Sequence, residues 1–87
     1  MNSEQVKLSE LPIENLLGVF IGILSNKAVE HMGLLQEGQK DLKLAAITID
    51  CVDSLTKQLE KLAPESAKTS RGLVSELQMA YVKASHE

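Results

Sequence analysis

Aromatic residues are almost absent from this chain: Phe20 and Tyr81 are the only two, and there is no tryptophan. Leu, Ile, Val and Ala therefore supply most of its apolar side chains. Only two prolines and five glycines interrupt the 87 residues. Because straight-chain and γ-branched side chains lose little rotamer freedom in a helix, this composition predicts an all-α protein. A chain of this length makes one domain and buries only about 60% of its unfolded surface, so its stability margin is small.

Clustered basic residues are also missing. Nine Lys and Arg residues stand against twelve Asp and Glu, and Arg71 is the only arginine. Nucleic-acid-binding surfaces normally carry clustered Lys or Arg, or aromatic side chains on which bases stack. We therefore expect no nucleic-acid partner.

Cys51 is the only cysteine, which excludes an internal disulfide and a multi-cysteine metal site. A reducing compartment suits such a chain. The first residues lack the basic start and apolar core of a signal peptide. The longest apolar run, residues 16–24, has nine residues, whereas a bilayer-spanning helix needs about twenty. We expect a cytoplasmic protein without a membrane span.

Helix signals divide the rest of the chain into three segments. Pro12 suits a first helical turn, and Gly33 suits a helix C-terminus, which predicts a helix over about 12–32. Asp41 can cap a second helix over 41–62, and Pro64 ends it and opens a third over 64–84. Short connections favour antiparallel neighbours. The sequence predicts a small antiparallel three-helix bundle, running up, down and up over residues 12–85, after a flexible tail over 1–11.

The first predicted helix is apolar on more than one side. One stripe is Ile13, Leu17, Phe20, Leu24 and His31. A second stripe is Gly18, Gly22, Ser25 and Val29. The later helices have one main stripe each: Ala45, Val52, Leu55, Leu59 and Leu62, then Leu73, Val74, Leu77, Ala80, Tyr81 and Ala84.

Two interpretations of the second stripe stay open. Small residues four apart let helix backbones approach closely, so the first helix could be the central one, touching both others. Alternatively, one stripe packs internally and the other meets a second copy of the chain, because an exposed apolar patch is otherwise a liability. We favour a homo-oligomer, with a dimer as the expected state. The possible interface consists of Gly18, Gly22, Ser25 and Val29, joined by Met79 and Val82 of the third helix.

His31 is the leading candidate for chemistry, since it continues an apolar stripe at the end of a helix. It is either a partly buried structural histidine or the centre of a small-ligand or metal site. Asp50 and Asp53 lie on a lysine-bearing side, where ion pairing with residues such as Lys57 is the ordinary explanation. No catalytic set, phosphate loop or metal signature can be assembled. We expect no enzyme activity and no cofactor.

The order of motifs resembles a small bacterial family of unknown function, the domain-of-unknown-function family numbered eighteen forty-four. The matching motifs are His31-Met32-Gly33-Leu34-Leu35, Asp41-Leu42, Ala45 through Ile49-Asp50, Leu55 through Leu59, and Leu77-Gln78-Met79-x-Tyr81-Val82. The resemblance implies a compact helical fold and no known activity. The chain departs from the family pattern in lacking the connector proline and in having Gln78 where members have arginine. The sequence thus predicts a non-enzymatic interaction or scaffold module, with a ligand or metal site near His31 as the alternative.

Overall fold

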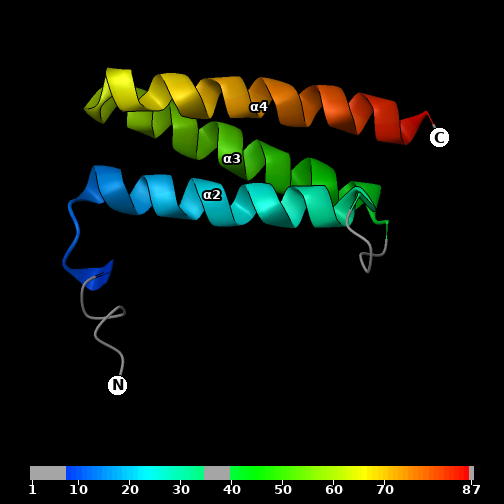
Figure 1. Cartoon of the computed structure of the whole chain (residues 1–87), viewed down its shortest axis with the longest axis horizontal. Helices are drawn as coiled ribbons and strands as arrows, with labels where there is room; N and C mark the ends of the chain where they lie inside the picture. The colour runs from blue at the N-terminus through cyan, green and yellow to red at the C-terminus, as the bar shows by residue number, and fades with distance from the viewer. Residues whose placement is uncertain (1–7, 35–39, 87) are drawn as a thin grey trace.

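The computed structural model describes residues 8–34 and 40–86. These residues form three helices and no strand: α2 (Ile13–His31), α3 (Leu42–Leu62) and α4 (Pro64–Ser85). The prediction of an all-α three-helix bundle is confirmed, and each predicted helix end lies within one residue of the observed one. The chain reverses direction at each connection, so α2 and α4 run the same way along α3 (Figure 1).

Gly33 ends α2 as the sequence predicts. Its φ of 77° lies in the left-handed region, which a residue with a Cβ rarely adopts. The Gly33 N–H donates to the carbonyl of Glu30 at 3.0 Å, and the Leu34 N–H donates to that of Val29 at 3.3 Å. These two bonds form a Schellman motif, which satisfies carbonyls that the helix end would otherwise leave unpaired.

The other predicted helix ends follow from single side chains. Asp41 Oδ1 accepts a hydrogen bond from the Leu44 N–H at 3.1 Å and caps α3. Ala63 closes α3 and also precedes Pro64, the first residue of α4. Residues 1–7 of the predicted tail and residues 35–39 of the predicted connection lie outside the described residues.

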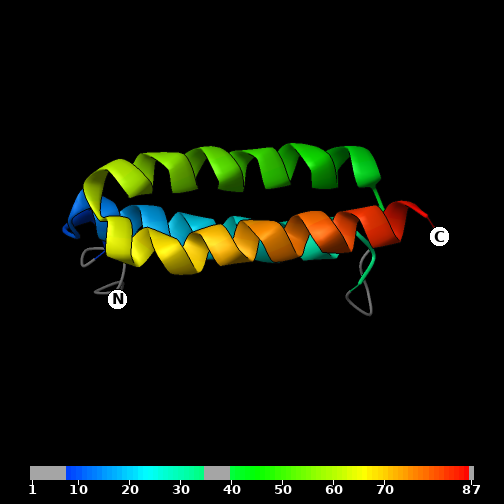
Figure 2. The same ribbon diagram turned by 90° about the horizontal axis from the view of Figure 1, so that it is seen from above.

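α3 is the middle helix of the bundle. Both α2 and α4 pack along its length, whereas they touch each other much less. Figure 2 shows α3 on one side of a layer made by α2 and α4. The interpretation that the first helix is central is therefore wrong, because the second helix holds that place.

The buried face of α2 lies between the two predicted stripes. Its buried residues are Leu17, Ile21, Ser25 and Ala28, and Met32 continues the row just after the helix. Leu17 is the only residue of the first predicted stripe that is buried, since Ile13 and Phe20 are 53% and 44% exposed. Because α2 is apolar on more than one side, its sequence pattern predicts a helix but does not show which side of that helix is buried.

The other helices depart less from the prediction. α3 buries Ala45, Ile49, Val52, Thr56 and Leu59, while Leu62 is 52% exposed. α4 buries Val74, Leu77 and Ala84 as expected, and adds Ala67 and Ser70 from its polar first half. The core therefore includes several alanine, serine and threonine side chains, which let the helices approach closely.

Candidate interaction surface

An ion-pair group joins α3 to α4 at one edge of the bundle. Arg71 of α4 donates to Asp53 Oδ1 at 2.5 Å and, through Nε, to Glu60 Oε2 at 3.1 Å. The hydrogen bond from Arg71 lowers the pKa of the Asp53 carboxyl, while partial burial opposes that change. The bonds to Glu60 and Asp53 raise the pKa of Arg71. Lys57 Nζ adds the predicted i,i+4 pair, 3.6 Å from Asp53 Oδ2. This group fixes α4 on α3 and leaves no unpaired charge for chemistry among its members.

The predicted glycine surface is open. Gly18 and Gly22 are exposed, and a Cβ added at either would meet no atom within 4 Å. Gly18 borders a shallow depression that also includes Ser66 and Thr69 of α4. Gly18 and Gly22 therefore make no close helix contact within the protomer. The space beside them is open to a second molecule.

The other predicted interface residues do not join the glycines in one surface. Ser25 is only 7% exposed, and its hydroxyl donates to the Ile21 carbonyl at 2.7 Å, so it belongs to the core. Val29 is half-buried and packs against that core. Met79 and Val82 are 72% and 55% exposed. They line a shallow hollow formed by α4 alone, and Val82 also borders the groove between α3 and α4.

Large apolar side chains gather instead on α2 and the neighbouring side of α3. They are 44% to 54% exposed, and we call this set the α2–α3 face: Ile13, Phe20, Ile23, Leu44, Ile47 and Leu62. Sequence reasoning placed Ile13, Phe20 and Leu62 in apolar stripes and left open which stripe of the first helix faces the core, so it did not identify this surface. The available signal was the spacing Ile13, Leu16, Phe20, Ile23, whose 3-4-3 steps form a stripe different from the buried one.

His31 lies half-buried at the end of α2. Its backbone carbonyl accepts a hydrogen bond from the Asp41 N–H at 2.6 Å, which ties the start of α3 to the end of α2. Within residues 8–34 and 40–86, no three His, Cys, Asp or Glu side chains are grouped closely enough to hold a metal ion. The structure thus places His31 beside a helix junction and outside any such group of the described residues.

No helix in the described part of the chain is both long and apolar enough to cross a bilayer. Comparison with protein-family models, with curated proteins and with solved structures found no match to this chain. The resemblance to the bacterial family therefore stays a prediction.

Proposed function

We propose that this protein is a non-enzymatic helical interaction module that self-associates through α2, with a homodimer as its working state. The observation that carries the proposal is the exposure of Ile13, Phe20 and Ile23 on one helix. Soluble monomers rarely leave large contiguous apolar patches in water, and such patches commonly mark interaction sites.

The composition of the protomer core supports the same conclusion. Alanines 28, 45, 67 and 84 are among its fully covered residues, each at most 3% exposed. Small side chains remove little apolar area from water, so the core contributes modestly to stability. Small domains with weak cores commonly gain stability by oligomerisation.

Sedimentation equilibrium at several concentrations of the full chain tests the proposal directly. A reversible increase in average mass from low to high micromolar concentration is the expected result. A single monomeric species at high micromolar concentration would overturn the proposal.

A Gly22→Leu variant tests whether the glycine surface takes part. The space around Gly22 is open, so the protomer accepts the larger side chain and its helix content stays the same. A weaker dimer would place Gly22 within the interface, and an unchanged dissociation constant would place it outside.

A cytoplasmic location and membership of the bacterial family belong to the same proposal. The exposed, single thiol of Cys51 supports the location, because a reducing compartment keeps such a thiol from oxidative cross-linking. Fractionation of the native host tests the location, and recovery of the protein outside the cytoplasm would overturn it.

A further inference from the structure

A shallow depression links the two helices that carry the α2–α3 face. It is lined by Leu24 of α2 and by Ile47, Asp50, Cys51, Ser54 and Leu55 of α3. Leu24 and Leu55 are half-buried and form part of its floor. Ile47 of the α2–α3 face borders this depression, whose lining is mostly apolar and has Asp50 and Ser54 as its polar members.

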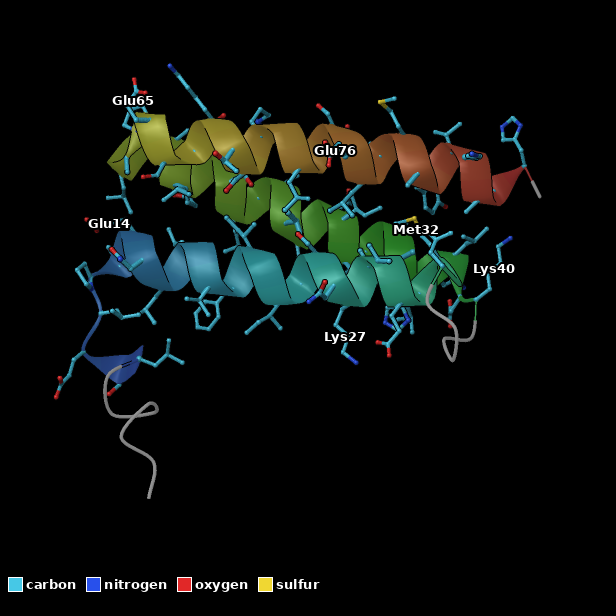
Figure 3. The ribbon with its side chains drawn as sticks, viewed as in Figure 1. Glu14, Lys27, Met32, Lys40, Glu65 and Glu76 are labelled. Atoms are coloured by element: carbon cyan, nitrogen blue, oxygen red, sulfur yellow. The ribbon has the colours of Figure 1, made fainter. Side chains whose placement is uncertain are left out.

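The α2 half of this face has the spacing of a helix-packing seam. Ile13, Leu16, Phe20 and Ile23 are separated by three, four and three residues, the steps that keep side chains along one side of a helix for a partner helix. The next position in the series is Lys27, which projects from α2 on the side away from α4 (Figure 3). The seam thus lies on the side of α2 opposite Gly18 and Gly22, and it ends at the charged residue Lys27.

The area is large enough for a dimer. Each of the six side chains of the α2–α3 face is about half exposed and presents roughly 100 Å². Six of them give on the order of 600 Å² per protomer, or about 1,200 Å² over two copies, the lower limit of a stable specific interface. Asp50 is the charged residue that lines the depression, and the six side chains themselves are uncharged, which suits a self-complementary contact better than a charged partner.

Resting on the proposed self-association, we propose that the occupant of the α2–α3 face is the same face of a second copy, related by a two-fold axis with the two α2 helices antiparallel. The charges set the direction. Lys27 and Glu30 form an ion pair within α2, with Nζ and Oε1 2.9 Å apart, and a parallel pair of helices would press two such exposed ion pairs against each other. An antiparallel pair centred on the seam opposes Ile13 with Ile23 and Leu16 with Phe20, and puts the Lys27 residues at opposite ends.

Charge substitutions at exposed positions test this interface without touching the protomer core. Phe20→Glu on α2 and Ile47→Glu on α3 each place a carboxylate within the α2–α3 face. Met79→Glu is the matched control, because Met79 is the most exposed large apolar residue of the described chain and lies on α4. Circular dichroism verifies that each variant keeps the wild-type helix content.

Sedimentation equilibrium of the full chain distinguishes the outcomes. We expect the dissociation constant to rise about tenfold or more with Phe20→Glu and with Ile47→Glu, and to change less than about twofold with Met79→Glu. If the wild-type protein dimerises but Met79→Glu weakens the dimer, this interface is wrong. It is also wrong if neither Phe20→Glu nor Ile47→Glu weakens the dimer. Both results leave self-association itself intact. A monomeric wild-type protein would overturn the proposed function, and this interface with it.

The native cysteine gives a second readout. Cys51 is exposed in the protomer and lines the depression of the face. Its reaction with a maleimide should slow as the wild-type concentration rises through the dissociation constant, and Phe20→Glu should remove that dependence. A labelling rate that stays constant while the mass doubles would place the interface elsewhere.

Discussion

Thr56 carries a polar group that the fold leaves without a partner. Its side chain is 0% exposed, and among the described residues no group forms a hydrogen bond with Oγ1. Two other helical hydroxyls behave differently: Thr48 Oγ1 donates to the Leu44 carbonyl at 2.7 Å, and Ser25 Oγ donates to that of Ile21 at the same distance. Replacing Thr56 by valine should therefore stabilise the protein.

The expected gain follows from the cost of an unpaired buried hydroxyl, which is about 1–3 kcal/mol. Valine has nearly the same shape as threonine, so Thr56→Val opens no cavity and makes no clash. The two residues also have similar helix propensities. We take the lower end of the range and expect a gain of about 1 kcal/mol, which raises the Tm of a domain of this size by about 4–8 °C.

Urea unfolding followed by circular dichroism measures the gain, with all variants at one low micromolar concentration so that association contributes equally. Thr48→Val is the control, because it makes the same substitution at a half-buried hydroxyl that already has a partner. We expect the control to change the stability by less than about 0.5 kcal/mol. A midpoint for Thr56→Val at or below that of the wild type, with an unchanged m-value, would show that the hydroxyl is satisfied in solution and would refute the reasoning.

Three further predictions concern a turn, an ion-pair group and a carboxyl group. Gly33→Ala should lower the stability by about 1–2 kcal/mol because φ at this position is positive. Gly22→Ala lies in a helix with open space around it and should raise the stability by up to about 1 kcal/mol. Thermal melts that shift the Tm of both variants in the same direction would contradict this prediction. Arg71→Met should lower the free energy of unfolding by about 1 kcal/mol or less at low salt, and by a smaller amount in 1 M NaCl, because the salt bridges to Asp53 and Glu60 are partly exposed. If urea titrations give the same loss at both salt concentrations, the packing of Arg71 contributes more than its charge. The lowered pKa of Asp53 means that its stabilising contribution is present above the unfolded-state value, about 3.9, and is lost as pH falls through the lower folded-state value. Asp53→Asn should therefore flatten the acid side of a plot of Tm against pH, and an identical profile for both proteins would contradict the assignment.

The helix ends could be predicted because their signals are local. Gly33 acts through its own φ angle, Asp41 through an amide three residues away, and Pro64 through its missing N–H and fixed ring. Each of these effects depends on a few neighbouring residues and not on the tertiary structure. One sequence is therefore enough to place the three helices.

The rotation of each helix about its axis could not be predicted in the same way. Thr56 is fully buried and Leu62 is half exposed, the reverse of what hydrophobicity alone favours. Arg71 holds Asp53 from eighteen residues away, and this contact helps to decide which side of α3 faces α4. A contact between residues so far apart in the sequence produces no helical periodicity from which it could be predicted. Ser25, which the sequence placed in the possible interface, is buried in the protomer for a related reason, since the pattern of a small polar residue is the same at a surface and in a close-packed core.

The distribution of side-chain sizes links the fold to the proposed association. Phe20, the bulkiest purely apolar residue, is 44% exposed, while Ala28 and Ala45 are completely buried. A chain optimised as a monomer would place its largest apolar groups inside, where they remove most area from water. If the second copy covers Phe20, part of the apolar core forms only on dimerisation, and stability then depends on protein concentration. The Tm of the wild-type protein should rise with concentration, and Phe20→Glu should remove that rise while leaving the three helices intact.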